Sequence, residues 1–220
     1  MKQQKQSFSA QIRKNVSLNY LFYSPKGYHD TSDTTWPLIL FLHGMGERGE
    51  DLELVKKHGI PKVVEEKDDF PFVVISPQCP QHSVWPEQLD TLHALIEETI
   101  HTYRIDTSRI YLTGLSMGGF GSWHLAEAYP HLFAAVVPIC GGTLPHVGFP
   151  ERIKVLKESP IWVFHGAKDE TVSLQMSQEL VDVLKAHSGN VKFTIYPDAE
   201  HDSWTATYNN PELYDWLLEQ

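Results

Sequence analysis

The chain has 220 residues, of which 41% are hydrophobic and 21% charged, and its formal net charge is −10. This composition is typical of one globular domain with enough apolar material for a large core, so we expect a single domain over residues 1–220. The negative charge disfavours electrostatic capture of nucleic acid or of an anionic membrane surface. We therefore expect neither as a partner.

The start of the chain and its cysteines bear on compartment and cofactors. Residues 1–10 contain lysines and glutamines but no apolar stretch that could form a signal-peptide core, and no later run reaches the length of a membrane span. Cys79 and Cys140 are the only cysteines, too few for a disulfide framework. The 12 histidines are scattered and lack the paired spacing of a metal site. We expect a cytoplasmic protein with two thiols, no metal and no cofactor.

The first half of the chain contains several short apolar runs. Residues 7–23 are interpreted as one or two strands at an antiparallel sheet edge. Five later runs are continuously apolar, as expected of parallel strands buried on both faces. These runs are 38–42, 72–75, 110–112, 133–137 and 161–164.

Helical patterns alternate with these runs. In 89–103, apolar residues recur at three- and four-residue steps, which predicts a crossover helix between two parallel strands. A second helix is expected over 174–184, an alternating strand at 191–195, and a last helix over 211–217 that begins at Pro211. Strand–helix alternation on this scale predicts an α/β fold with a mostly parallel central sheet flanked by helices.

A Gly-x-Ser-x-Gly motif links one predicted strand to the next predicted helix. The strand at 110–113 runs into Gly114-Leu115-Ser116-Met117-Gly118-Gly119, and a helical stretch follows over 120–129. Glycines on both sides of Ser116 allow a sharp turn that projects the hydroxyl above the carboxyl edge of the sheet. The following helix brings its positive end close by. The pattern favours a nucleophilic serine; the alternative is a Gly/Ser-rich turn that only connects the two elements.

A second glycine-rich loop follows the strand at 38–42. Residues 43–49 read His-Gly-Met-Gly-Glu-Arg-Gly and leave the sheet at the same edge. An oxyanion formed at Ser116 needs two backbone N–H donors, and Met117 and Met45 are the candidates. The alternative is a loop that serves chain reversal alone. We expect His43 to be a structural hydrogen bonder.

Candidates for the acid and the base follow the last two predicted strands. The strand at 161–164 leads into a turn that presents Asp169, and the strand at 191–195 is followed by His201. After Asp169 the only other histidine is His187, at a helix end. A neutral imidazole can take the Ser116 proton, while a carboxylate fixes the tautomer and stabilises the cation.

Three other acids compete with Asp169 for that role. Glu170, Asp198 and Asp202 lie near the same turns, and a lone acid on a loop is usually only solvated. Asp169 is favoured by its position in the turn after the strand. The order Ser, Asp, His, with each residue after its own strand, predicts a catalytic triad.

Together these segments resemble the phospholipase/carboxylesterase-like branch of the α/β-hydrolases. The motifs are the loop 42–49, the serine turn 114–119, His-Gly-Ala-Lys-Asp at 165–169 and Glu-His at 200–201. The Gly-Glu-Arg-Gly loop and Ser-Pro-Gln-Cys-Pro at 76–80, followed by Trp85, look closest to small bacterial carboxylesterases akin to polyhydroxybutyrate-depolymerase and feruloyl-esterase-like proteins. The resemblance implies an α/β-hydrolase fold with about eight strands and no metal cofactor. It also implies triad roles for Ser116, Asp169 and His201, and oxyanion amides from Met45 and Met117.

The substrate is less constrained. Trp85, Phe120 and Trp204 lie beside the site loops in sequence and either line a pocket or pack beneath the loops. The stretch from residue 140 to 160 is too short for a cap domain, which predicts small soluble esters with short acyl groups. The alternatives are a serine peptidase or amidase, a feruloyl-type esterase, or a non-catalytic ligand-binding protein of this fold. The oligomeric state is left open, with a homodimer among the alternatives.

Overall fold

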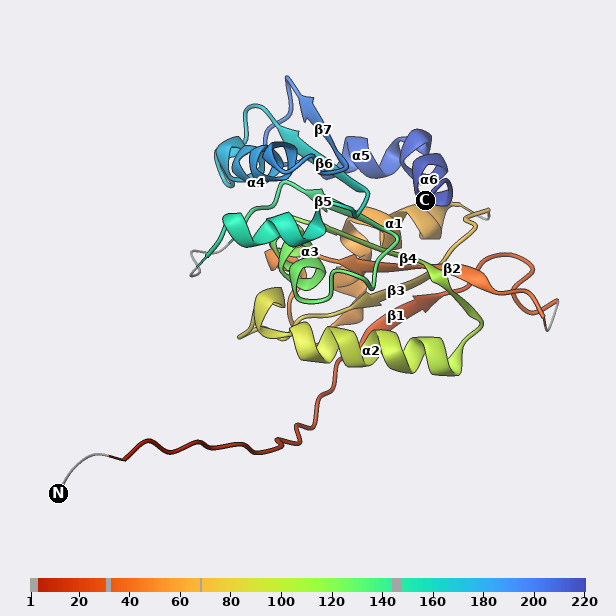
Figure 1. The fold of residues 1–220 in the computed structure, drawn as a ribbon. Helices are drawn as coiled ribbons and strands as arrows, with labels where there is room; N and C mark the ends of the chain where they lie inside the picture. Colours follow the sequence, from red (N-terminus) through yellow and green to blue (C-terminus); the bar gives the residue numbers. More distant parts are fainter. Residues whose placement is uncertain (1–3, 31–32, 68, 144–147) are drawn as a thin grey trace.

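One twisted sheet organises the protein. The computed structural model describes residues 4–30, 33–67, 69–143 and 148–220. Within these ranges seven strands form a sheet of order β1-β3-β2-β4-β5-β6-β7, with all neighbours parallel except β1 and β3 (Figure 1). The strands are β1 Tyr20–Tyr23, β2 Trp36–Leu42, β3 Val73–Pro77, β4 Ile105–Leu115, β5 Ala135–Ile139, β6 Ile161–Gly166 and β7 Val191–Tyr196. The expected α/β class and mostly parallel sheet are confirmed, with seven described strands where about eight were expected.

Helices cover both faces of the sheet. α2 Leu89–Thr102, α3 Met117–Ala128 and α4 Leu174–Ala186 pack on one face, while α1 Gly59–Glu66, α5 Trp204–Asn209 and α6 Pro211–Leu218 pack on the other (Figure 1). Four 3₁₀ helices complete the described elements: η1 Met45–Glu47, η2 Leu52–Lys57, η3 Trp85–Glu87 and η4 Glu151–Leu156. The helices expected over 89–103, 174–184 and 211–217 correspond to α2, α4 and α6.

β2 shows why the central strands read as unbroken apolar runs. Leu38, Leu40 and Leu42 point into the core beneath α2, α3 and α4, whereas Ile39 and Phe41 point into the core beneath α1, α5 and α6. All five side chains are fully buried. A strand covered on both faces needs apolar residues at every position, so the sheet is held by two cores rather than one.

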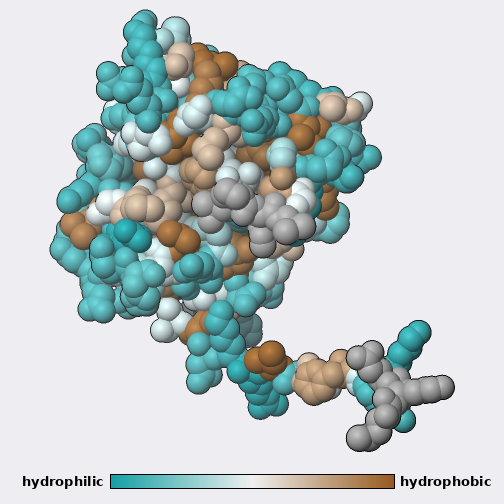
Figure 2. All heavy atoms as spheres, turned by 90° about the vertical axis from the view of Figure 1, so that its left-hand side faces the viewer, coloured by the Kyte–Doolittle hydropathy of each residue, from teal (hydrophilic) through white to brown (hydrophobic). Residues whose placement is uncertain are grey.

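The amino-terminal part of the chain differs from its prediction. The antiparallel edge strand exists, but it is limited to β1, which pairs with β3 from Tyr20 opposite Pro77 to Tyr23 opposite Val74. Residues 4–19 form no strand in the structure, and Phe8 and Ile12 are 93% and 91% exposed. This segment extends away from the body of the molecule (Figure 2). Apolar and polar residues alternate over 8–12 and 16–20, so the local pattern allows a strand, but among the described residues only Tyr20–Tyr23 of this part of the chain pairs with β3.

The connection between β5 and β6 contains no cap domain in the residues described. Of residues 140–160, the structure describes 140–143 and 148–160, and their one helix is the short η4. Leu144 and Pro145, part of the turn expected here, lie outside the described residues. Across the described ranges, no helix has both the length and the apolar character needed to cross a bilayer.

Phe41 tests how much the core beneath α1, α5 and α6 contributes to stability. Its ring packs edge-on against Tyr208 at a centroid distance of 5.7 Å. Phe41→Ala should lower the free energy of unfolding by about 3–5 kcal/mol, because it removes a fully buried ring and leaves a cavity. Urea denaturation measures this change. Val155→Ala, at a 46% exposed side chain, is the control and should cost under about 1 kcal/mol. Equal losses of stability in the two variants would contradict the placement of Phe41 in the buried core.

Candidate active site

Ser116 sits on a strained turn between β4 and α3. Its backbone angles, φ 53° and ψ −116°, lie on the left-handed side that a residue with a side chain rarely adopts, at a cost on the order of 1–3 kcal/mol. A side chain at Gly118 would overlap the Leu42 carbonyl, and one at Gly114 would overlap the Gly118 carbonyl. The glycines of the motif therefore let β2, β4 and α3 approach closely, and this approach holds the turn in place.

Hydrogen bonds join Ser116, His201 and Asp169 in a continuous chain. His201 Nε2 lies 2.9 Å from Ser116 Oγ, and His201 Nδ1 lies 2.7 Å from Asp169 Oδ2. A carboxylate can only accept, so Nδ1 carries the proton and donates it to Asp169. In the neutral ring Nε2 is then the acceptor for the Ser116 hydroxyl.

The Asp169 carboxylate is buried, and both of its oxygens accept hydrogen bonds. Its Oδ1 accepts the N–H groups of Thr171 and Val172, both at 2.9 Å, while Oδ2 faces His201. Burial by itself raises the pKa of this carboxyl, but the bonds from His201 and from the two amides outweigh it and bring the pKa below its usual value. Asp169 is therefore ionised at neutral pH.

His165 is a neighbour that the sequence analysis did not single out. Its ring is fully buried, and Nε2 lies 2.9 Å from the Val172 carbonyl and 3.2 Å from Asp169 Oδ2. Both of these groups accept, so Nε2 holds a proton. Burial lowers the pKa of the ring and favours its neutral form. His165 lies four residues before Asp169 in the His-Gly-Ala-Lys-Asp segment, and this spacing is the only sequence signal for the contact.

The competing acids lie elsewhere. Asp202 accepts the amide and the hydroxyl of Thr205, both at 2.9 Å, at the start of α5. Asp198 pairs with Lys168 at 2.8 Å on the exposed surface, and Glu170 is exposed. Of the four acids considered, the structure brings Asp169 to His201.

Met45 and Met117, the two predicted amide donors, begin helices that start beside Ser116. Met117 is the first residue of α3 and Met45 the first of η1, and both line one cavity together with Ser116. First-turn N–H groups have no carbonyl acceptor within their own helix. Both residues therefore carry first-turn amides and lie beside Ser116.

His43 holds the loop that carries Met45. Its Nε2 accepts the Cys79 amide at 3.0 Å, so Nδ1 carries the proton and donates to the Gly44 carbonyl at 2.6 Å. Burial lowers the pKa of the ring to about 4. The ring is therefore neutral under ordinary conditions and ties the loop to the end of β3, as expected of a structural hydrogen bonder.

An apolar cavity of about 300 Å³ opens at Ser116. It is lined by Met45, Val84, Pro86, Met117, Phe120, Thr171 and Val172. Phe120 thus lies where a pocket residue was expected. Trp85 does not line it: the side chain is fully buried, and its Nε1 donates to the His43 carbonyl at 2.9 Å, so it packs beneath the loop.

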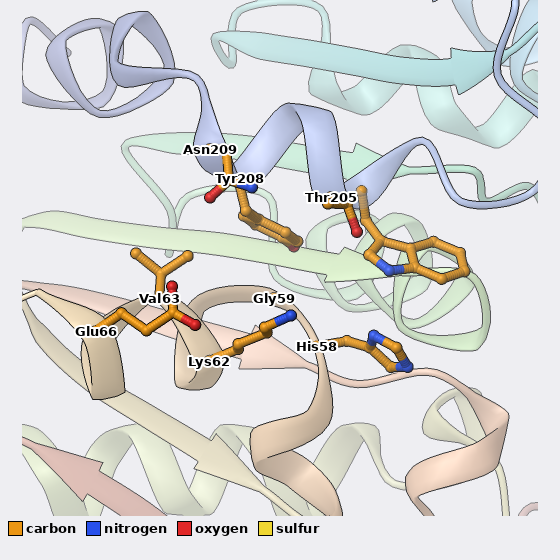
Figure 3. Close-up of a pocket in the computed structure, with 9 residues that line it drawn as sticks. His58, Gly59, Lys62, Val63, Glu66, Thr205, Tyr208 and Asn209 are labelled. Atoms are coloured by element: carbon orange, nitrogen blue, oxygen red, sulfur yellow. The ribbon is translucent and has the colours of Figure 1, made fainter.

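A smaller, polar cleft of about 90 Å³ lies between α1 and α5. Figure 3 shows His58 and Lys62 on one wall and Thr205, Tyr208 and Asn209 on the other. Trp204 also lines this cleft, and its ring packs edge-on against His201 at 5.2 Å between centroids. Trp204, the third aromatic residue predicted to line the pocket, therefore lines the polar cleft and not the apolar cavity at Phe120.

The fold agrees with comparisons to known proteins. A family model described as Phospholipase/Carboxylesterase matches residues 70–210. The chain belongs to this phospholipase/carboxylesterase family. It is an esterase- and thioesterase-type family of α/β-hydrolases, and the proteins similar to this chain include esterases and a thioesterase.

Three relatives illustrate the range of this family and fold. The bifunctional acetylxylan esterase/xylanase XynS20E of Neocallimastix patriciarum is 30% identical over 189 residues, 82% of this chain and 26% of that protein. Lysophospholipase-like protein 1 of Mus musculus is 26% identical over 95% of each chain. The structure of a thermostable esterase has a TM-score of 0.77 and 36% identity, covering 92% of this chain and 59% of that one. The chain therefore spans about a quarter of the first relative and less than two thirds of the last.

One group of possible metal ligands occurs among the described residues of this esterase-family chain. Donor atoms of Cys140, Asp169 and His201 lie within 4.8 Å of one another. Asp169 and His201 are bonded to each other, and burial raises the pKa of the Cys140 thiol to about 12. A metal would need the thiolate and would break the 2.7 Å bond, so the arrangement fits a proton relay better than a metal centre.

The lowered pKa of His43 makes stability depend on pH. Between about pH 6.5 and 4 the unfolded chain binds a proton at His43 that the folded protein does not, so the free energy of unfolding should fall as the pH drops through this window. His43→Gln keeps an acceptor and a donor but cannot titrate. From pH 7 to 4, the free energy of unfolding of this variant should fall by about 3 kcal/mol less than that of the wild-type protein. Urea denaturation at stepped pH tests this, and identical pH dependences would refute it.

Proposed function

We propose that this protein is a serine carboxylesterase that hydrolyses short-chain carboxylic esters through an acyl-enzyme intermediate. The observation that carries the proposal is the chain of hydrogen bonds from Asp169 through His201 to Ser116, at 2.7 Å and 2.9 Å. Family membership and the 36% identity to a thermostable esterase agree with this chemistry. The proposed catalytic triad consists of these three residues.

The first step forms the acyl-enzyme. His201 Nε2 takes the proton of Ser116 as Oγ attacks the ester carbonyl carbon. Asp169, ionised and held by two amides, stabilises the imidazolium and keeps Nδ1 protonated. The N–H groups of Met45 and Met117 serve as the oxyanion hole, since they belong to helix starts on the rim of the same cavity.

The acyl-enzyme is complete once the imidazolium has given its proton to the leaving alkoxide, which departs as an alcohol. The second step regenerates the serine. Water donates a proton to His201 Nε2 and attacks the acyl carbonyl; collapse of the second intermediate breaks the bond to Ser116 Oγ, which takes the proton back from His201, and the acid is released. The alcohol departs, and the water enters, on the side of the site where His201 lies. The acyl group lies on the other side, in the apolar cavity beside Phe120.

The triad assignment predicts a graded loss of ester hydrolysis. Ser116→Ala and His201→Ala should each lower kcat on the order of 10⁶-fold, and Asp169→Asn on the order of 10⁴-fold, because the acid orients and stabilises the base without bonding to substrate. Hydrolysis of p-nitrophenyl acetate measures this. Asp202→Asn is the control and should stay within a few-fold of wild type, since Asp202 accepts hydrogen bonds from Thr205 in the first turn of α5 and not from His201. A larger effect of Asp202→Asn than of Asp169→Asn would show that Asp169 is not the acid of the triad.

The cavity and the lack of a described cap predict a limit on acyl length. Each methylene buried in the apolar cavity contributes about 0.8 kcal/mol, whereas a methylene left in water contributes nothing. kcat/KM for p-nitrophenyl esters should therefore rise from acetate to butyrate and then level off, without activation at a lipid interface. Values still climbing at decanoate would mean that the pocket is deeper than its volume of about 300 Å³ indicates.

A further inference from the structure

His165 uses both of its ring nitrogens, although it lies outside the proposed triad. The ring is fully buried, and its Nε2 lies 2.9 Å from the Val172 carbonyl and 3.2 Å from Asp169 Oδ2. Its Nδ1 lies 2.8 Å from the hydroxyl of Ser177 in α4, and this hydroxyl lies 2.9 Å from the Gly141 carbonyl. The ring therefore joins the turn after β6, helix α4 and the loop after β5.

The partners of this ring fix its tautomer. The two oxygens that face Nε2 only accept, so Nε2 carries the proton and donates it to Val172. Burial lowers the pKa of His165, which keeps the ring neutral and leaves Nδ1 as an acceptor for the Ser177 hydroxyl. His165 thus presents one N–H of fixed direction to the turn that carries Asp169.

Val172 connects this N–H to two parts of the site. Its amide donates to Asp169 Oδ1 at 2.9 Å, its carbonyl accepts from His165, and the residue lines the apolar cavity at Ser116. Thr171 also donates its amide to Oδ1 at 2.9 Å and lines the same cavity. The segment 171–172 therefore both supports the acid and forms a wall of the cavity assigned to the acyl group.

The other end of the network reaches the helix that follows the nucleophile. Ser177 bonds to the backbone of Gly141, and a side chain at Gly141 would overlap the backbone of Gly119 and Phe120 in the first turns of α3. Phe120 lines the apolar cavity as well. The network around His165 therefore links two segments that line this cavity, one before α4 and one in α3.

One N–H at this place has two effects. Its bond to the Val172 carbonyl restrains the turn 169–172, and its positive end faces the Asp169 oxygen that His201 also uses. Both effects hold the acid in place without contact to substrate. We propose that His165 is a positioning residue for ester hydrolysis, whose Nε2–H ties the acid of the triad to the wall of the acyl cavity. This inference rests on the proposed esterase function.

Two amide substitutions separate the roles of the ring nitrogens. His165→Gln can place its NH₂ group near the position of Nε2, whereas the shorter His165→Asn reaches only the position of Nδ1, next to Ser177. For p-nitrophenyl butyrate, kcat should stay within about threefold of wild type in His165→Gln. It should fall about tenfold or more in His165→Asn, the effect of one lost hydrogen bond at a charged group. A greater loss in His165→Gln than in His165→Asn would overturn the proposal.

Proton NMR reports on the acid without requiring turnover. The proton between His201 Nδ1 and Asp169 Oδ2 lies in a short, charge-assisted bond of 2.7 Å and resonates at low field. In His165→Asn, Oδ2 accepts from His201 alone, so the resonance should move to still lower field, whereas in His165→Gln it should keep its wild-type position. A fall in kcat with an unchanged resonance in His165→Asn would show a structural role only, and the proposal would be wrong.

The acyl cavity provides a second readout. Two additional methylenes predict a kcat/KM about tenfold higher for p-nitrophenyl butyrate than for the acetate in the wild-type protein. In His165→Asn this ratio should fall to about threefold or less, because the Val172 carbonyl loses its donor. Val172→Ala trims the wall but keeps both backbone groups, so it should lower the ratio and leave the resonance unchanged. A wild-type ratio in His165→Asn would refute the link between acid and cavity.

Tyr214→Phe is the control for stability. The Tyr214 hydroxyl donates to the Tyr208 carbonyl at 2.7 Å in the core on the other face of the sheet. This variant also loses one buried hydrogen bond, so thermal unfolding should show a lower stability, but kcat, the acyl ratio and the resonance should match wild type. Equal losses of kcat in Tyr214→Phe and His165→Asn would mean that activity follows stability, and the positioning role would be wrong.

Two further outcomes are decisive. Should His165→Asn not fold, His165→Gln decides alone: a kcat within about threefold of wild type supports the role of the Nε2 donor, and a loss of about tenfold or more overturns it. If the wild-type protein hydrolyses no ester, the esterase proposal itself fails. An active protein whose two His165 variants behave alike overturns only the role of His165.

Discussion

The parallel register of the central strands is the constraint on which the site depends. Leu42 of β2 lies opposite Gly114 of β4, and Gly166 of β6 lies opposite Tyr196 of β7. Strands that run in one direction and end level with their neighbours release their following loops at one edge of the sheet. The segments after β2, β4, β6 and β7, far apart in sequence, therefore meet without any long connecting loop. Hydrogen-bonded backbone supports each functional side chain from below.

Close packing turns this register into a defined geometry. The amino end of α3 approaches the Leu42 carbonyl so closely that only glycine fits at position 118, and Ser116 is held in a left-handed conformation at the junction. The two buried cores stabilise this local strain, because relaxing the turn would separate α3 from β2. A rigid turn fixes the Ser116 hydroxyl relative to His201, whose Nε2 lies 2.9 Å from it.

The polar groups at this edge fall into two kinds. Asp169 is buried but saturated, with two amides on one oxygen and histidines facing the other, and its charge is fixed by those partners. The indole nitrogen of Trp204 is buried without a hydrogen-bond partner among the described residues. The partners of Asp169 hold it against His201, and the apolar cavity lined by Phe120 opens at Ser116.

The sequence alone determined the elements whose signal is local. Unbroken apolar runs predicted β2 to β6 because strands covered on both faces need no polar positions, and the glycines around Ser116 marked the turn. Strand order along the chain then predicted Asp169 and His201 as partners of Ser116, and the structure brings these three side chains together. Only the tertiary structure decided what depends on contacts between distant residues. It buried Trp85 beneath the loop, brought His165 to Asp169, and left the described residues 4–19 outside any strand. Sequence periodicity indicates which face of a helix or strand is apolar. It does not indicate which side chains of other elements contact that face, and these contacts determine the hydrogen bonds in a site.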